Sequence, residues 1–254
     1  MSELQAASIG ARDPAPPRGG FFHNDARASV PHAAPGQIAE SADEFDNSFQ
    51  VCIADDAHRR HRASSLIQRR YAWRGYSTTA LEGNGAGRVT LSAHMDDAIV
   101  ATITAALDSD EGLYVGRLYP EEIGRLRAEG RKLCEFTKLA VDESVRSHAV
   151  LGAIFHVACM YAINLHRCTD VLVEVNPRHV RFYQRMLGFK RAAEERLDPE
   201  VNAPAVLLRL DLGHCAREIA RLGGHRKHST ERSFYPFFFS PAETARIVGR
   251  LCGH

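Results

Sequence analysis

The sequence has no excess of one charge, because 32 lysines and arginines and 31 aspartates and glutamates leave a net charge of +1. Nothing global therefore attracts it to a polyanion, and we expect no nucleic-acid partner. The six cysteines form no CxxC pair, which argues against a disulfide framework and a zinc site. We expect no metal site either, since the HxxH pairs His58 with His61 and His225 with His228 lie among cationic residues.

Signals of membrane insertion or export are also missing. The first residues have neither the basic start nor the apolar segment of a signal peptide, and no stretch reaches the roughly 18 apolar residues that span a bilayer. We therefore expect a cytoplasmic protein without a transmembrane segment. Hydrophobic residues at 44% and charged residues at 25% are typical of globular proteins, so a sizeable core can form.

Residues 1–47 differ in composition from the rest of the chain. They hold five of the eleven prolines and seven acidic residues against three arginines. Such a segment buries too little apolar surface to offset its ordering entropy. The sequence therefore predicts a disordered leader, which can be removed with little change in melting temperature, followed by one domain over residues 48–254.

Apolar periodicity in that domain predicts an α/β (α+β) fold with a mixed central sheet and helices on both faces. Strands are expected at 49–55, 88–93, 98–107, 133–141 and 170–175, and helices at 63–73, 120–130, 146–166 and 176–187. The strands 88–93 and 98–107 should form an antiparallel hairpin, and 189–195 with 204–212 a closing hairpin joined through 196–203. Helix 146–166 is expected to be central and buried, with Ser147 as its N-cap.

The segment NPRHVRFYQRMLGFK, residues 176–190, follows a buried strand directly. Its Asn176, Tyr183 and Gly188-Phe189 fall at the intervals of a helix motif of the GCN5-related N-acetyltransferase (GNAT) superfamily, which the segment resembles. The order of elements from 88 to 212 extends the resemblance to the acyltransferase core. A GNAT-like fold is therefore implied, with a C-terminal helical and aromatic extension.

Within that superfamily, the stretches 69–76, 122–135 and 134–142 resemble the long-chain N-acyl amino acid synthases, relatives of the acyl-homoserine lactone synthases. Both groups have an acidic residue two positions before a Ser or Thr that a basic residue follows, as in Glu135, Thr137 and Lys138. The resemblance implies acyl transfer from acyl carrier protein to the amino group of an amino acid. It implies acyl-phosphopantetheine as the donor group and no permanently bound cofactor.

Amide formation from a thioester needs a base for the amine and a proton source for the departing thiolate. Glu135, which strand alternation places on one face with Thr137, is the candidate base or amine-binding group. Tyr183 is the candidate proton donor. The alternatives are an ion pair for Glu135 and a core tyrosine whose hydroxyl finds a local partner for Tyr183.

The turn that enters helix 146–166 is the candidate donor-binding segment. Arg146, Ser147 and His148 are expected to hold the phosphate of the donor, together with Asn176, although a simple helix cap is the alternative. The turn lacks the glycine pair that usually cradles the pyrophosphate of coenzyme A, which favours acyl carrier protein as donor. A coenzyme A-dependent N-acetyltransferase and a non-catalytic acyl-binding module remain as alternatives.

Three arginines, Arg178, Arg181 and Arg185, recur at intervals of three and four along one predicted helix. They share a helix face that would attract a strongly acidic carrier protein. A solvated surface face is the alternative interpretation.

Aromatic residues are the candidate lining of an acyl pocket. Tyr71 and Trp73 on the first helix, with Thr137, are assigned to the acyl and substrate pocket. The aromatic residues within 234–239 either line an acyl tunnel, where each buried methylene of the chain gains roughly 0.8 kcal/mol, or pack in the core.

Overall fold

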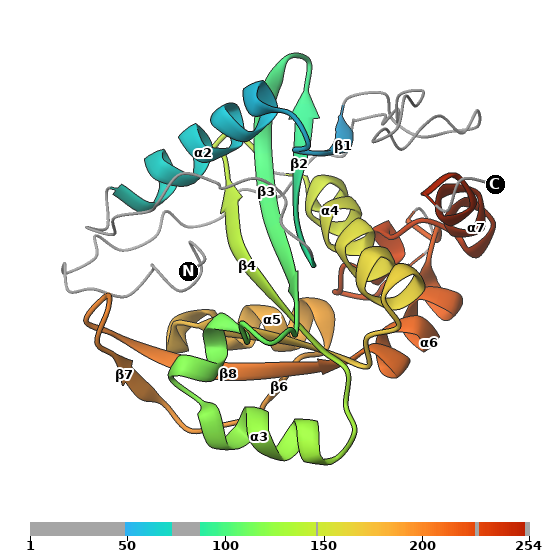
Figure 1. Cartoon of the computed structure of the whole chain (residues 1–254). Coiled ribbons are helices and arrows are strands. Elements are labelled where there is room, and N and C mark those ends of the chain that lie inside the picture. The colour runs from blue at the N-terminus through green and yellow to red at the C-terminus, as the bar shows by residue number, and fades with distance from the viewer. Residues whose placement is uncertain (1–48, 73–86, 146, 227–228, 252–254) are drawn as a thin grey trace.

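The computed structural model describes residues 49–72, 87–145, 147–226 and 229–251 (Figure 1). The predicted leader over residues 1–47 lies outside these ranges, so its disorder stays a prediction. In the described residues, eight strands form a sheet in the order β1-β2-β3-β4-β5-β8-β6, with β7 paired to β8. All neighbouring strands are antiparallel except β4 and β5, which are parallel.

The strands are β1 (Gln50–Ile53), β2 (Arg88–Met95), β3 (Ala98–Leu107), β4 (Leu133–Val141), β5 (Asp170–Val175), β6 (Lys190–Arg191), β7 (Arg196–Asp198) and β8 (Ala203–Asp211). The α-helices are α2 (Ala57–Ala72), α3 (Pro120–Ala128), α4 (His148–Met160), α5 (Val180–Leu187), α6 (Leu212–Leu222) and α7 (Pro241–Leu251). Shorter helical turns are η1 (Tyr114–Arg117), η2 (Tyr161–Leu165), η3 (Pro177–His179) and η4 (Tyr235–Phe237).

The antiparallel hairpin of β2 and β3 is confirmed, and β4 and β5 have the predicted bounds. The expected closing hairpin is wrong in its middle, because residues 196–198 form a strand, β7, on β8. The backbone N–H of Glu200 donates to Asp198 Oδ1 at 2.9 Å, and Asn202 adopts a left-handed φ of 48°. These residues make a tight turn that folds β7 back onto β8.

Helices cover both faces of the sheet, as predicted (Figure 1). The largest hydrophobic cluster packs α4, α5, α6 and the C-terminal segment against one face of the sheet. On the other face, α2 packs against β3 and β4, and η1 and α3 pack against β4, β5 and β8. Ser147 caps α4 by accepting a hydrogen bond from Ala149 N at 3.1 Å, as expected. Because nearly all side chains of α4 are buried, this helix is the centre of the core.

One window of the described residues, His148–Leu165, is apolar enough in length and composition to span a membrane, with a mean hydropathy of 1.5. The sequence expectation that no such stretch exists is therefore wrong by this measure. In the fold, 67% of the window is buried inside the protein, and the core helix of a folded domain passes the same test. The burial follows from its central place between the sheet and the C-terminal segment.

The aromatic segment 234–239 packs against α4. A Cβ on Gly152 would lie 2.8 Å from Cβ of Phe237, so glycine permits this close approach. Phe239 N donates to Nδ1 of the fully buried His156 at 2.9 Å, and Phe238 stacks on the same imidazole. Four aromatic residues of the segment are buried, namely Phe234, Tyr235, Phe238 and Phe239. The contacts favour the core-packing interpretation of this segment.

Candidate active site

The two parallel strands of the sheet run side by side only at their starts. Leu133–Glu135 of β4 pair with Asp170–Leu172 of β5, and further along β4 pairs with β3 while β5 pairs with β8 (Figure 1). The pairing of β3 with β4 shifts by one residue between Thr102 and Thr104 of β3. The extra residue lies in β4 beside Lys138, whose φ of 51° is left-handed, so β4 has a bulge there. We call the point where Glu135 and Leu172 make the last pair the strand fork.

Glu135 lies at the strand fork and is fully buried. Its Oε2 accepts a hydrogen bond from Val115 N at 3.0 Å, and its Oε1 has no hydrogen-bond partner in the described part of the chain. Burial raises the pKa of Glu135 to about 7, although the bond from Val115 acts in the opposite direction. A carboxyl group with a pKa near 7 is suited to accept a proton at neutral pH.

Thr137 shares the sheet face of Glu135, as predicted, because the two pair with the alternate residues Thr104 and Ala106 of β3. Thr137 is 4% exposed, and within the described ranges its Oγ1 has no hydrogen-bond partner. The hydroxyl of Thr104 hydrogen-bonds to that of Thr90 at 2.8 Å. Buried hydroxyl groups therefore continue the polar surface of Glu135 across three strands.

The sequence interpretation missed a second buried carboxyl group, that of Glu174 on β5. Glu174 is 2% exposed, and its Oε2 lacks a hydrogen-bond partner among the described residues. Burial, followed by the charge of Asp198 and a hydrogen bond to it, raises the pKa of Glu174 to about 8. The signal was present in the sequence as an acid between two valines in the strand DVLVEV.

Tyr183 lies on α5, in the cluster that covers the opposite face of the sheet. Its ring makes edge-on contacts with Phe155 at 6.3 Å and Phe189 at 5.4 Å between centroids. Burial raises the pKa of its hydroxyl well above the ordinary value. Tyr183 thus packs as a core aromatic and keeps its proton, which a proton donor also requires.

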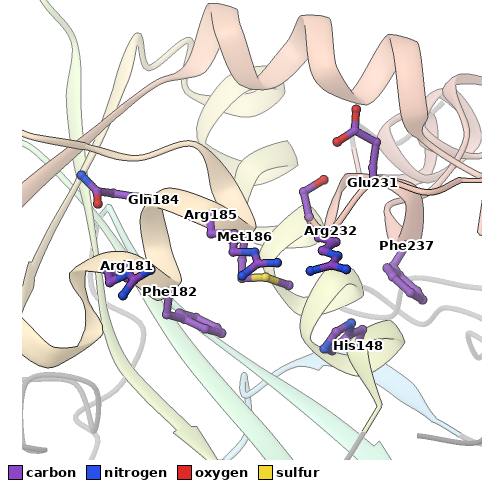
Figure 2. A pocket seen from close by; sticks show the side chains of 10 residues that line it. His148, Arg181, Phe182, Gln184, Arg185, Met186, Glu231, Arg232 and Phe237 are labelled. Carbon is purple, nitrogen blue, oxygen red and sulfur yellow. The ribbon is translucent and has the colours of Figure 1, made fainter. Parts of the chain in front are cut away.

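A pocket of about 820 Å³ opens between the start of α4, helix α5 and the segment before η4 (Figure 2). Its lining includes three arginines, a histidine and two aromatic rings, which are Arg181, Arg185, Arg232, His148, Phe182 and Phe237. The sequence analysis assigned Arg181 and Arg185 to carrier docking and His148 to donor binding, and in the fold all three line this pocket. Arg232 was missed because it lies in a loop, where spacing carries no signal.

Other predicted donor-binding residues have structural partners. The Ser147 hydroxyl is the cap of α4, next to the pocket. Asn176 Oδ1 accepts from Arg178 N at 3.2 Å, and Asn176 Nδ2 donates to Pro204 O at 2.9 Å, so its side chain ties the start of η3 to β8. Neither Asn176 nor Arg178 lines the pocket. Their assignments to donor binding and carrier docking stay predictions.

Tyr71 is fully buried where α2 packs on β3 and β4. Its neighbours there are Leu66, Ile67, Ile99 and Ala140. Tyr71 does not line the pocket beside α5, and its assignment to an acyl pocket stays a prediction. Two further predicted residues, Trp73 and Arg146, lie outside the described residues.

Comparison with known proteins agrees with this architecture. The sequence profile of the family described as N-acyl amino acid synthase FeeM matches residues 62–211, which is more than half of the chain. The solved structure of FeeM, an N-acyl amino acid synthase from uncultured soil microbes, is 25% identical, with a TM-score of 0.58. The match covers 66% of this chain and 94% of that one.

Two other solved structures are similar at lower scores. An acyl-CoA N-acyltransferase from Pseudomonas aeruginosa is 16% identical, with a TM-score of 0.44 over 63% of this chain and 97% of that one. The AHL synthase LasI is 13% identical, with a TM-score of 0.46 over 65% and 89%. A search of curated proteins gave no significant match. The GNAT-like acyltransferase fold expected from the sequence is confirmed by the match to FeeM.

Proposed function

Since this chain belongs to the N-acyl amino acid synthase FeeM family and is an N-acyltransferase, we propose that it transfers a long-chain fatty acyl group from acyl carrier protein to the amino group of an amino acid. The observation that carries the proposal is the carboxyl group of Glu135, which is buried at the strand fork with a pKa of about 7 and has one oxygen that no described residue contacts through a hydrogen bond. A basic pocket on the other side of the sheet supplies a place for the donor.

Glu135 acts as the base in this proposal. An amino acid reaches the site as an ammonium ion, which has no lone pair to attack a thioester. Glu135 Oε1 takes one proton from it, and the nitrogen lone pair then forms the new bond to the thioester carbon. Because Oε2 is held by Val115 N, the carboxyl group stays oriented while Oε1 gains and loses the proton. A positioned base of this kind contributes roughly 10²- to 10⁴-fold in rate.

Collapse of the tetrahedral intermediate breaks the carbon–sulfur bond and leaves a thiolate. Tyr183 is proposed to give this thiolate a proton and to regain one from the nitrogen that has become an amide. The hydroxyl is protonated at every working pH because burial raises its pKa. Its place on α5, on the face opposite Glu135, separates the proton donor from the base.

The pocket beside α5 is the proposed site for the phosphopantetheine arm of the donor. Arg181, Arg185 and Arg232 suit a phosphate group, and the aromatic rings beside them suit the apolar part of the arm. Glu231, also in the lining, pairs with Arg221 at 3.2 Å and leaves the three arginines in excess. Such a basic surface also attracts an acidic carrier protein.

Coenzyme A is the less favoured donor because the turn that enters α4 lacks a glycine pair, and the backbone of its first turns is covered by side chains. Gly152 is in the first turns of α4, where a GNAT cradle would need exposed backbone, but Phe237 covers it. Ala149 and Val150 before it are buried as well. The single phosphate of an acyl carrier protein needs no such cradle.

The test is a competition between donors. Purified protein is incubated with a mixture of amino acids and either palmitoyl carrier protein or palmitoyl-coenzyme A, and products are identified by mass spectrometry. We expect an N-acyl amino acid, formed several times faster from the carrier protein. Equal rates would contradict the choice of donor. A parallel reaction contains acetyl-coenzyme A, and an acetylated amine formed only there would support the N-acetyltransferase instead.

A further inference from the structure

Two buried carboxyl groups, those of Glu135 and Glu174, occupy neighbouring strands at the strand fork. Glu135 pairs with Leu172, so Glu174 is two residues further along β5 on the same sheet face. With a rise of about 3.3 Å per residue and strands about 4.8 Å apart, their backbones are roughly 8 Å apart before the strands diverge. Two glutamate side chains that start at this separation can contact one small group between them.

Neither carboxyl group is held in an ion pair within the described part of the chain. In the described ranges, no ion pair includes Glu135, Glu174 or Asp198. Arg88 and Arg117 lower the pKa of Glu135 only by attraction from outside ion-pair distance, and Arg117 itself pairs with Glu200. The guanidinium of Arg196 binds Glu122 at 2.7 Å and lies over the ring of Tyr119. A buried carboxylate without a counter-ion is expensive to keep, so binding an external cation is a plain use for this pair of carboxyl groups.

The two groups carry different charges at neutral pH. Glu174 holds a proton, because burial and the charge of Asp198 raise its pKa to about 8, and it donates this proton to Asp198. Asp198 also accepts the backbone N–H of Glu200 at 2.9 Å, which fixes its orientation. Glu174 Oε2 is then an acceptor oxygen to which none of the described residues donates, while Glu135 is the group able to take up a proton.

We infer that Glu174 is a second acceptor-binding residue: its Oε2 accepts one N–H of the acceptor ammonium while Glu135 removes a different proton, and Asp198 positions Glu174. The inference rests on the proposed amino acid acyltransferase. Glu174 keeps its own proton throughout, so the proton balance of the reaction is unchanged. Its role is to hold the nitrogen beside Glu135 with the lone pair directed at the thioester.

Two substitutions of Glu174 separate this role from a structural one. Glu174→Gln places an amide N–H toward Asp198 and an oxygen toward the ammonium, which reproduces the protonated acid. Glu174→Leu removes both, in a position bordered by Leu172 and Leu207 where an apolar side chain packs. We expect the leucine variant to lose roughly 10- to 100-fold in kcat/KM for the acceptor. The glutamine variant should stay within a few-fold of wild type.

The positioning role of Asp198 has its own variant. Asp198→Asn leaves one carbonyl oxygen for the two donors that Asp198 now accepts, from Glu174 and from Glu200. We expect the KM of the acceptor to rise several-fold while the KM of the acyl donor stays constant. Glu194→Gln, at a 92% exposed side chain, is the control and should change neither constant.

The kinetics are measured by mass spectrometry of the N-acyl product, with folding checked by circular dichroism. The inference would be overturned if kcat/KM for the acceptor were unchanged in Glu174→Leu. It would also be overturned if a folded Glu174→Gln lost as much kcat/KM for the acceptor as the leucine variant. If the leucine variant does not fold, the glutamine and asparagine variants decide by the same criteria. A wild-type protein that acylates no amino acid contradicts the proposed function itself, which is a different result.

Discussion

Replacing Glu135 by glutamine should make the protein more stable at alkaline pH, although it removes the proposed base. Glutamine keeps the size of the side chain and an oxygen for the hydrogen bond from Val115. What it removes is a charge that the fold buries completely and whose Oε1 has no hydrogen-bond partner among the residues that the structure describes. Groups kept for chemistry often reduce stability in this way.

The size of the effect follows from the pKa of Glu135, which burial raises from 4.5 to about 7. A group whose folded pKa is raised binds its proton more tightly in the folded state, so stability falls as pH rises from 4.5 to about 7 and is constant above. A difference of about 2.5 pKa units corresponds to about 3 kcal/mol. At pH 5 the same calculation gives a loss of stability from Glu135 of less than about 1 kcal/mol.

The assay is urea denaturation of wild type and Glu135→Gln at pH 8 and pH 5. We expect the variant to have the higher free energy of unfolding at pH 8 and the difference to shrink at pH 5. Glu194→Gln, at an exposed position, should match wild type at both values. A glutamine variant that is no more stable than wild type at pH 8, or a gain independent of pH, would refute the reasoning.

Three further predictions concern the donor pocket, the core and the proton donor. Reversing Arg181 and Arg185 to glutamate should raise the KM for acyl carrier protein and weaken its salt dependence, while Arg125→Glu on α3, 64% exposed, should not; steady-state kinetics at two ionic strengths decide. Gly152→Ala should lower the melting temperature by several degrees, because its Cβ would lie 2.8 Å from a side-chain atom of the aromatic segment and overpacking costs about 1–3 kcal/mol; an unchanged scanning-calorimetry trace would contradict the packing. Tyr183→Phe should slow turnover at all pH values without changing the KM of the acceptor, and wild-type turnover would return this residue to a purely structural role.

The fold could be predicted from the sequence where one local rule decided the outcome. β4 and β5 have the predicted bounds because apolar and β-branched residues predominate in both and few charged residues interrupt them. Helix α4 begins where Ser147 offers a cap. Residues 196–198 gave no such signal, since a three-residue strand depends on its partner β8 more than on its own composition.

The site was predicted in part. Glu135 and Thr137 were placed on one face correctly, because alternation along a strand is local. Glu174 was not assigned, since an acid in an apolar strand becomes meaningful only when a neighbouring strand brings another carboxyl beside it. The pocket shows the same limit: Arg232 is 47 residues from Arg185 in sequence (232 − 185), and only the packing of the C-terminal segment on α4 places both around one space.

The central claim is that Glu135 is the base of an N-acyl transfer, and the rate of N-acyl product formation against pH tests it most directly. Wild type should gain activity with an apparent pKa near 7, the value that burial gives Glu135. Glu135→Gln should be roughly 10²-fold slower at neutral pH, with the gap narrowing at high pH where the amine loses its proton unaided. Identical pH profiles for the two proteins would contradict the claim.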